Sequence, residues 1–511
     1  MSGLEPGGSL AKLLSWRVAE RPDRGFAFVE DDGPWTYVQL AAASVELGRR
    51  LGGLAGGDRV ILRLGNDERF LPAAAAVWCR GGTVVAMHPA TPVEDVARIG
   101  AAMDTRMMIC DPDDPVVGAV DLPTLTFPRF SPEDGAETRE LAAAFASPTG
   151  NDALAPALIL LTSGSTGEPK GVVLTHDSAW TMLRATVSSF RRDPGPSPLA
   201  AEGKAPNLIA SPLSHTGGVI RLLVALYVGR SVVLLKKFDG RSAKRLIDRH
   251  QIDSLTINPT MMRMLIDALE PDEALGSVLY VSSGTAPLTP ALREEFEARF
   301  NVPVLQAYGQ TETFGAVAIE SARDVLAGRR RPASVGRPLP GVTLRLVKAD
   351  GSEAATGQEG EIRVRTRTAM AGYLGSGDAS ALDDEGWLRT GDLGKLDKDG
   401  YLYVTGRLKN IVICGGFNVV PEEVEAALDA DPDVRESVVV GVPDDRLGEI
   451  PVALVESNLA AAAVLDNVRV RLAAYKRPRR VFVVDALPRV LNGKVDRPQC
   501  QKIAQSLVVE V

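Results

Sequence analysis

The stretch "LILLTSGSTGEPKGVVLTH", residues 158–176, predicts two short strands joined by an unusual loop. The apolar runs at 158–161 and 172–174 have the length and composition that buried strands prefer. Between them, four hydroxyl side chains and three glycines surround Lys170. Glycines let a backbone approach a ligand closely, and N–H groups, hydroxyls and a lysine together suit phosphate oxygens. The loop is therefore predicted to bind a phosphate-bearing ligand.

Three other interpretations of this loop fit less well. A Walker A loop has Gly directly before the Lys and Ser or Thr directly after it, whereas Pro169 and Gly171 hold those positions. A serine-hydrolase turn needs Gly two residues before the nucleophile, and Ser165 has Ser163 there. A plain hairpin turn accounts for glycines but leaves the four hydroxyls unexplained. The sequence thus favours a phosphate site outside the P-loop class.

Length and composition bound the class of protein. A chain of 511 residues exceeds the size at which one hydrophobic core keeps growing, so at least two domains are expected. With 45% hydrophobic and 24% charged residues, the chain is typical of folded globular proteins. Its net charge of −8 and the lack of a Lys/Arg block argue against nucleic acid as a partner.

The sequence also bears on cellular location, disulfides and metal sites. No apolar stretch approaches the roughly 20 residues that span a bilayer, so no membrane span is expected. Residues 1–23 carry charges within their apolar pattern, which is typical of an amphipathic helix rather than a signal peptide, so a cytoplasmic location is expected. The four cysteines lack a CxxC pair and the four histidines lack metal-ligand spacing, so neither disulfides nor a structural metal is expected.

The pattern of elements predicts an α/β protein with a large N-terminal domain. Helical patterns at 40–51 and 290–300 alternate with β-rich runs at 58–64 and 277–284. Such alternation favours largely parallel, buried strands, arranged here as α/β subdomains.

The texture of the sequence changes from about residue 334. Gly-punctuated strands there predict a small β-barrel or antiparallel sheet appended to the α/β body. After Gly406, a further hundred residues alternate strand and helix patterns, with Pro421 at the first turn of one helix. Two units are predicted: a large domain of residues 1–408 and a small α+β C-terminal domain of residues 409–511.

Six further motifs follow the loop along the chain: "PLSHTGG" (212–218), "SSGTAPL" (282–288), "QAYGQTE" (306–312), "WLRTGDLG" (387–394), "YLYVTGRLKNIVICGGFNVVPEEVE" (401–425) and "LPRVLNGKVDR" (487–497). Together with "LTSGSTGEPKG", and in the same order, they resemble the signatures of the adenylate-forming superfamily. That superfamily includes acyl-CoA synthetases, peptide-synthetase adenylation domains and firefly luciferase. The motifs cover the chain from roughly residue 10 to 500 and are most similar to those of fatty-acyl or aryl acyl-CoA synthetases.

The resemblance implies a two-step reaction. A carboxylate attacks the α-phosphorus of ATP to give an acyl-adenylate and pyrophosphate, and a thiol then displaces AMP. The chain is accordingly expected to be an enzyme, an AMP-forming acid–thiol ligase. ATP, Mg²⁺ and CoA, or a carrier protein's phosphopantetheine, are the implied cofactors. The small C-terminal domain is expected to be mobile and to carry the catalytic lysine.

The same resemblance assigns the catalytic residues. Lys494 matches the lysine that bridges the attacking carboxylate and the ribose or α-phosphate oxygens. Thr311 should bond the α-phosphate, Glu312 should hold Mg²⁺, and His215 should move between the two half-reactions. Without the motifs, Lys494 would be taken for a solvated residue after an Asn-Gly turn, and His215 for a structural histidine.

Nucleotide contacts are implied as well. Asp392 should accept both ribose hydroxyls with help from Arg407, and Tyr308 should form part of the adenine slot. The complete set expected around ATP is Thr162, Ser163, Gly164, Ser165, Thr166, Gly167, Lys170, Gly284, Thr285, Ala286, Tyr308, Gly309, Asp392 and Arg407.

Three further assignments concern the second half-reaction and the acid. Lys409 occupies the position of the family's hinge between the domains. The thiol-binding loop is expected at Gly415, Gly416 and Phe417, and the acid pocket at His215, Thr216, Gly217, Gly218 and Val219. Amino-acid-activating domains place an Asp after the aromatic residue of this motif, and its absence here favours a neutral, apolar acid.

The acceptor and the assembly state stay open. CoA is the first choice, but a discrete acyl carrier protein presents the same pantetheine thiol. A stand-alone ligase that loads such a carrier, or stops at the adenylate, is the alternative, and a homodimer is not excluded. A luciferase-like oxygenase has no support in the sequence. A catalytically inactive binding protein is disfavoured because Lys170, Glu312, Asp392 and Lys494 are all present.

Overall fold

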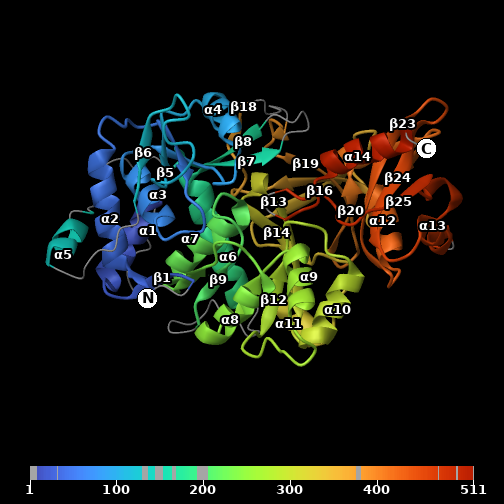
Figure 1. Ribbon diagram of the computed structural model, residues 1–511, viewed down its shortest axis with the longest axis horizontal. Helices are drawn as coiled ribbons and strands as arrows, with labels where there is room; N and C mark the ends of the chain where they lie inside the picture. Colours follow the sequence, from blue (N-terminus) through green and yellow to red (C-terminus); the bar gives the residue numbers. More distant parts are fainter. Residues whose placement is uncertain are drawn as a thin grey trace.

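The structure is a computed structural model, and it describes residues 8–30, 33–128, 136–143, 145, 153–163, 169–192, 205–375, 381–469, 471–490 and 493–509. Residues 164–168, the centre of the loop quoted above, lie outside these ranges. Figure 1 shows a large body built from the N-terminal and middle parts of the chain, with the C-terminal part as a smaller body at one end.

The opening stretch forms two neighbouring strands of a seven-stranded sheet. Strand β7 (Pro156–Ser163) runs antiparallel to β8 (Pro169–Thr175), with Ser163 opposite Pro169. The strand order is β18-β8-β7-β4-β3-β5-β6, and every pair from β7 to β6 is parallel. The remaining strands are β3 (Arg59–Arg63), β4 (Thr83–Ala86), β5 (Met107–Cys110), β6 (Thr124–Thr126) and β18 (Gly372–Gly375).

Helices bury the parallel part of this sheet. Strand β4 is buried along its whole length, which accounts for its unbroken apolar sequence. Helix α2 (Tyr37–Arg50) begins at a capping box in which Thr36 and Gln39 bond each other's backbone. The other helices of the large domain are α1 (Ala11–Glu20), α3 (Phe70–Cys79), α4 (Val93–Ala102), α5 (Ala136–Ala143), α6 (His176–Arg192), α7 (Thr216–Val228), α8 (Gly240–His250), α9 (Pro259–Ala268), α10 (Pro290–Phe300) and α11 (Ala322–Leu326).

Two further sheets complete the α/β part. One has the order β2-β1-β10-β9, and the other has the order β11-β12-β13-β14-β15. In the second, β11, β12 and β13 are parallel, so their carboxyl ends meet at one edge, where a ligand is expected in open α/β sheets. These strands are β1 (Gly25–Val29), β2 (Trp35–Thr36), β9 (Asn207–Ile209), β10 (Val232–Leu234), β11 (Ser254–Thr256), β12 (Tyr280–Ser283), β13 (Val304–Gln310), β14 (Gly315–Ile319) and β15 (Arg337–Pro338).

The Gly-punctuated region forms antiparallel strands, as expected. Strands β16 (Thr343–Val347), β17 (Gly360–Arg365), β19 (Leu388–Leu396) and β20 (Leu402–Arg407) pair in that order. The pairing is that of an open four-stranded sheet rather than a closed barrel. Backbone hydrogen bonds from Val335 to Leu402 (2.9 Å) and from Leu402 to Gly336 (2.8 Å) join its edge to the segment before β15.

The C-terminal residues have a core of their own. An apolar cluster spans residues 412–508 around the sheet β22-β21-β24-β23, with β25 paired to β24. Pro421 is the first residue of α12, as the sequence predicts. The elements are β21 (Val412–Cys414), β22 (Phe417–Val419), α12 (Pro421–Asp429), β23 (Val434–Asp444), β24 (Gly448–Ser457), α13 (Ala461–Arg469), β25 (Arg480–Val483) and α14 (Arg497–Val509).

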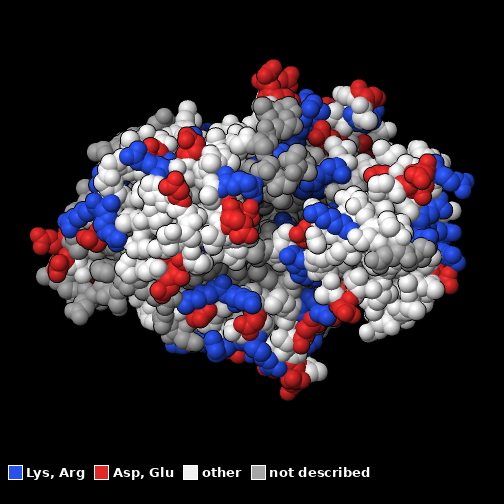
Figure 2. All heavy atoms as spheres, turned by 45° about the horizontal axis from the view of Figure 1, so that its top comes forward, with Lys and Arg blue, Asp and Glu red and all other residues white. Residues whose placement is uncertain are grey.

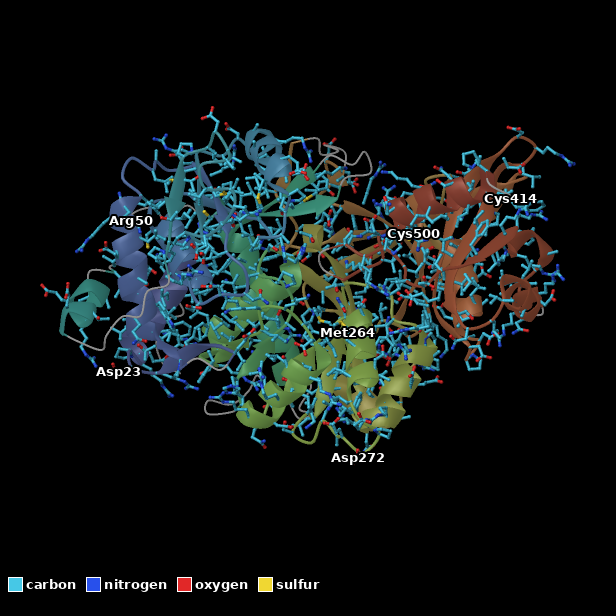
Figure 3. All side chains as sticks on the ribbon, in the orientation of Figure 1. Asp23, Arg50, Met264, Asp272, Cys414 and Cys500 are labelled. Atoms are coloured by element: carbon cyan, nitrogen blue, oxygen red, sulfur yellow. The ribbon has the colours of Figure 1, made fainter. Side chains whose placement is uncertain are left out.

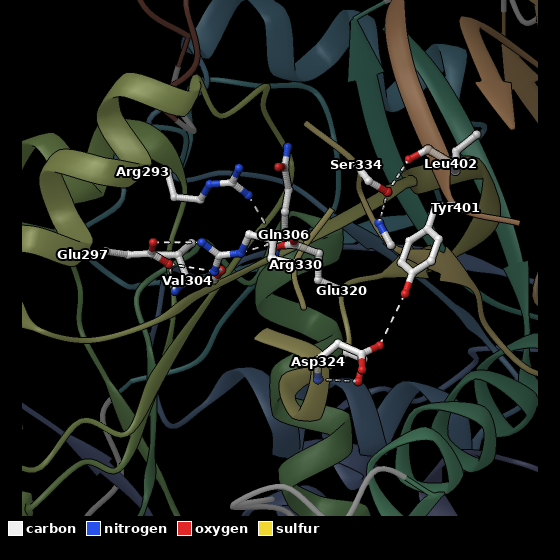
Figure 4. Close-up of polar contacts among 12 residues, drawn as sticks. Arg293, Glu297, Val304, Gln306, Glu320, Asp324, Arg330, Ser334, Tyr401 and Leu402 are labelled. Carbon is white, nitrogen blue, oxygen red and sulfur yellow. Dashed lines mark hydrogen bonds and ion pairs between the residues drawn. The ribbon is translucent and has the colours of Figure 1, made fainter. Parts of the chain in front are cut away.

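A network of buried charges holds strand β13 in place (Figure 4). The Arg330 guanidinium donates to both carboxylate oxygens of Glu297, at 2.7 and 2.8 Å, and to the Val304 carbonyl at 2.7 Å. The Glu320 carboxylate accepts from the backbone N–H of Gln306 at 2.7 Å. These contacts position β13 just before the residues that it contributes to the site.

Other global features concern membrane spans, cysteines and surface charge. Within the described ranges, no helix is long and apolar enough to cross a membrane. Cys414 and Cys500 both lie in the C-terminal part and are free thiols (Figure 3), as are Cys79 and Cys110. On the face shown in Figure 2, acidic and basic side chains are interspersed.

Replacing Arg330 by Met should lower the free energy of unfolding by about 2 kcal/mol, because it leaves the partly buried Glu297 without its bidentate cation and removes one of two cations beside the buried Glu320. Urea unfolding followed by tryptophan fluorescence measures this, since all five tryptophans lie before residue 408. Arg263→Met is the control. It breaks the more exposed Arg263–Glu295 pair and should cost about 1 kcal/mol or less. Equal losses in both variants would contradict the role given to the buried network.

Candidate active site

A buried carboxylate, Asp392 on β19, lies at the centre of the candidate site. Asp392 is only 3% exposed to solvent. The Tyr308 hydroxyl and the Gln310 amide each donate to its Oδ2 at 2.7 Å, and the Arg407 guanidinium pairs with its Oδ1. Arg407 is also its cross-strand partner on β20, so the antiparallel register itself sets this ion pair.

The ionisation of its neighbours fits this arrangement. Burial, and then the Asp392 charge, raise the pKa of Tyr308 well above its usual value, so the phenol stays a hydrogen-bond donor at neutral pH. Burial alone would lower the pKa of Arg407, but Asp392 outweighs it and raises that pKa. The cluster is therefore a hydrogen-bonded charge pair in which Asp392 faces only donors among the contacts described.

A second carboxylate lies at the carboxyl end of β13. Glu312 is in the short 3₁₀ turn Thr311–Thr313, and its Oε1 accepts from the Tyr373 hydroxyl at 2.8 Å. The Lys170 ammonium lies 5.2 Å from the centre of the Tyr373 ring. Strands β8 and β18 thus bring Lys170 and Tyr373 to the same place as Glu312.

Lys494 enters the site from the C-terminal domain. Gly493 precedes it with φ of 82°, and the Thr260 hydroxyl at the start of α9 donates to the Gly493 carbonyl at 2.8 Å. Burial and the nearby Arg407 lower the pKa of Lys494 to about 8, while Glu312 and Asp392 oppose that shift. The lysine therefore lies among the residues that the motifs predict to be its neighbours.

His215 lies near Lys494, just before helix α7. It precedes the first turn of α7 in an extended conformation. Burial, with His88 and Lys494 nearby, lowers its pKa to about 4, so the imidazole is neutral at pH 7. Next to it, the Thr216 hydroxyl donates to Thr311 Oγ1 at 2.8 Å, which links α7 to the turn that carries Glu312.

Close backbone approaches explain two of the predicted glycines. A Cβ on Gly309 would lie 2.0 Å from the Gly315 carbonyl oxygen, and one on Gly218 would lie 2.3 Å from the Pro212 carbonyl oxygen. Thr285 has φ of 69°, a conformation that costs energy for a β-branched residue and is typical of functional loops. The predicted adenine slot at Gly284, Thr285 and Ala286 follows β12 directly.

Not every predicted residue is seen at this cluster. Gly164, Ser165, Thr166 and Gly167 lie outside the described residues, although Thr162 and Ser163 end β7 opposite the strand that carries Lys170. The predicted thiol loop, Gly415 to Phe417, lies in the β21–β22 hairpin of the C-terminal sheet. There Phe417 is 57% exposed and its ring lies 5.1 Å from that of Tyr475.

Lys409 lies in the chain between the strand that carries Arg407 and the hairpin that carries Gly415 to Phe417. It occupies the 3₁₀ turn Leu408–Asn410 that joins β20 to the C-terminal domain. Burial, followed by Arg407, lowers its pKa.

Four contributors were not assigned from the sequence. Gln310 lies inside the quoted motif "QAYGQTE", so a signal was present. Tyr373, Thr260 and His88 stand outside the regions to which roles were given, and only their contacts identify them.

The chain belongs to the AMP-binding enzyme family. The model of the "AMP-binding enzyme" matches residues 14–374, and that of the "AMP-binding enzyme C-terminal domain" matches residues 423–494. The order of the two matches agrees with the large and small domains described above.

Relatives over the whole chain agree with this class. The sulfoacetate–CoA ligase of Cupriavidus necator is 34% identical over 509 residues, covering 96% of each chain. The ATP-bound structure of MatB from Rhodopseudomonas palustris matches with a TM-score of 0.84 at 29% identity, over 97% of this chain and 99% of that one. The structure of the O-succinylbenzoate coenzyme A synthetase of Bacillus subtilis, in complex with ATP and magnesium ion, matches with a TM-score of 0.79 at 27% identity. The match covers 96% of this chain and 99% of that one.

These comparisons confirm three predictions from the sequence: the adenylate-forming superfamily, the α/β fold with a large and a small domain, and the enzyme class of acid–thiol ligases.

Proposed function

We propose that this protein activates a carboxylic acid with ATP and transfers the acyl group to the thiol of CoA. The observation that carries the proposal is the position of Lys494, which the C-terminal domain places beside Arg407, Glu312 and Asp392 of the large domain. The residues that the motifs predicted to act together are thus close in space, although the chain separates them widely.

The charges of the cluster suit the first half-reaction. A carboxylate must approach a polyphosphate, so the step needs fixed cations that stabilise the charge of the transition state. Lys494, Arg407 and Lys170 supply such cations around the two carboxylates. Thr311, whose hydroxyl is already oriented by Thr216, is positioned to bond a phosphate oxygen.

Glu312 fits the role of a magnesium ligand. Its Oε1 accepts one hydrogen bond from Tyr373, and its Oε2 has no hydrogen bond or ion pair to any described residue. Carboxylate oxygens are the protein ligands that Mg²⁺ prefers, and a bound ion would neutralise phosphate charge at this point.

The nucleoside has matching groups in the same region. Asp392 is the carboxylate we assign to the ribose hydroxyls, with Arg407 holding it in position. Gln310 bonds both Asp392 and the Thr390 carbonyl, so it fixes the carboxylate from a second side. Tyr308, together with the strained loop after β12, offers an aromatic face and flat backbone for adenine.

The entrance to the acid site is uncharged. The residues that follow His215 are Thr216, Gly217, Gly218 and Val219, and none can pair with an ammonium group. An α-amino acid is therefore disfavoured as substrate. The neutral His215 adds no charge of its own where the reacting carboxylate would approach Lys494.

The second half-reaction requires the C-terminal domain to turn. In the observed arrangement Lys494 occupies the site, whereas the loop of Gly415 to Phe417 lies on the C-terminal sheet, its aromatic residue exposed. Rotation about Lys409 would withdraw the lysine and present the loop to an incoming thiol, a hinge motion of a few residues. We propose that CoA supplies this thiol. Product analysis with CoA or with a carrier protein as the acceptor distinguishes the two.

Lys494→Ala should lower acid-dependent ATP–pyrophosphate exchange about 100- to 1,000-fold while ATP binding largely persists, because the amine acts mainly on the transition state. Exchange of labelled pyrophosphate and ATP binding by calorimetry measure the two effects. Lys502→Ala, which changes an exposed lysine on α14 of the same domain, is the control and should leave both unchanged. Undiminished exchange in Lys494→Ala would remove the catalytic role.

The pH profile should carry the signature of the same amine. The charged form exists below a pKa of about 8 and is lost as the pH rises through it. The value of kcat/KM for exchange should therefore fall about tenfold per pH unit above that point. Lys494→Arg keeps its charge, so its lower activity should show no such alkaline limb. An identical limb in both enzymes would assign it to another group.

Lys409→Pro should restrict the turn between the domains, because proline fixes its own φ and disfavours a helical conformation in the residue before it. We expect CoA-dependent thioester formation to fall about tenfold or more, with adenylation less affected. Lys409→Ala leaves backbone rotation free and is the matched control. Equal loss of both half-reactions in the proline variant would count against domain alternation.

A further inference from the structure

Helix α7 carries an accessible stripe that leads away from the candidate site. Thr216, Gly217, Ile220 and Arg221 are half-buried, whereas residues 222–227 are fully buried. Positions 216 and 217 are followed three residues later by 220 and 221, and this spacing puts all four on a single helix face. The stripe therefore begins at the first turn of the helix and runs to Arg221, and the next half-buried residue of the helix is Val228, two turns further on.

The stripe is continuous with the proposed reaction site. At its start, the Thr216 hydroxyl contacts Thr311 at 2.8 Å. One turn further, Ile220 packs directly over Gly315 at the start of β14, where a Cβ would lie only 3.0 Å from Ile220 Cδ1. Arg221 follows Ile220 directly, about 7.5 Å along the helix axis from Thr216.

Arg221 is a cation for which the described residues supply no counter-ion. Burial is the main cause that lowers its pKa, with Tyr280 opposing the shift and Arg230 adding to it. Among the described residues, no carboxylate lies within ion-pair distance of Arg221. Asp253, which lies near Tyr280, is already paired with Arg230. Burial raises the pKa of Tyr280 to about 12, so its phenol is neutral and supplies no charge.

A half-buried guanidinium without a counter-ion is costly in proportion to its burial, and the cost is recovered when an anion binds it. A guanidinium also matches the two oxygens of a carboxylate or the oxygens of a sulfonate better than any other side chain. The location at the end of an accessible stripe distinguishes Arg221 from a buried arginine that only braces the fold, such as Arg63, which pairs with Asp114.

We propose that Arg221 binds a second anionic group, a carboxylate or sulfonate, at the far end of the acid substrate. The proposal rests on the proposed function and narrows it. It departs from the wholly apolar acid expected from the first turn of α7, because it concerns the distal end of the pocket. The substrate class is then a dianionic acid whose second charge lies several bonds from the reacting carboxylate.

The test compares diacids with their uncharged counterparts in the purified full-length enzyme. Acid-dependent ATP–pyrophosphate exchange is measured for glutarate, adipate and pimelate, each against its monomethyl ester. Wild-type enzyme should prefer the best diacid over its ester by about tenfold or more in kcat/KM. Arg221→Met should raise KM for that diacid about 10- to 100-fold with a smaller change in kcat, and leave the ester within about twofold. Arg221→Lys should restore part of the preference.

Arg245→Met, an exposed arginine on α8, is the matched control and should change neither substrate. Equal losses for diacid and ester in Arg221→Met would overturn the proposal, because a bracing role affects both. If that variant is not recovered, the wild-type preference and Arg221→Lys decide. A wild type that prefers esters or other neutral acids would overturn this inference and leave the proposed function standing. Absence of exchange with every acid in a broad panel would overturn the proposed function itself.

Discussion

The site depends on one ion pair, that of the buried Asp392 with the more exposed Arg407. A carboxylate only 3% exposed is stable only when donors surround it, and here they come from two sheets. Arg407 belongs to the neighbouring strand, whereas Tyr308 and Gln310 belong to β13. The bonds from Tyr308 and Gln310 to Asp392 therefore hold strand β13 against the antiparallel sheet. Arg407 also leads directly into the turn from which the C-terminal domain begins, so the same interaction anchors the start of that domain.

More cations than carboxylates lie around this pair. Lys170, Arg407, Lys409 and Lys494 gather near two carboxylates, and burial, followed by the charge of Arg407, lowers the pKa of both Lys409 and Lys494. Such a cluster is strained without an anion and is relieved when phosphates and a carboxylate enter. The C-terminal domain thus has an electrostatic reason to leave when the products depart, which is what the proposed alternation requires.

Helix α7 relates the reacting end of the acid to its far end. Its first turn contacts the turn that carries Glu312, and its accessible stripe ends at Arg221. Because a helix is rigid over this length, the distance between the two ends of the pocket is set by the backbone rather than by flexible side chains. Selection by length and by distal charge then follows from one element.

Local pattern determined much of this protein. The run at 290–300 forms a helix with those same bounds, since Thr289 and Pro290 are local start signals. The strands on either side of the opening loop pair as a hairpin, and the motifs name most of the residues near Asp392. These features depend on neighbouring residues or on a family's shared order, both of which a single sequence contains.

Tertiary structure decided the rest, because the deciding contacts join residues far apart in the chain. The Tyr373–Glu312 bond spans 61 positions, and the Thr260–Gly493 bond, next to Lys494, spans 233. No local propensity encodes such pairs, since their free energy depends on which surfaces the fold brings together. The openness of the four-stranded sheet belongs to this second group, as does the charge of Arg221, which no carboxylate among the described residues neutralises. Each is defined by what lies beside a residue in space, which the order of the residues does not reveal by itself.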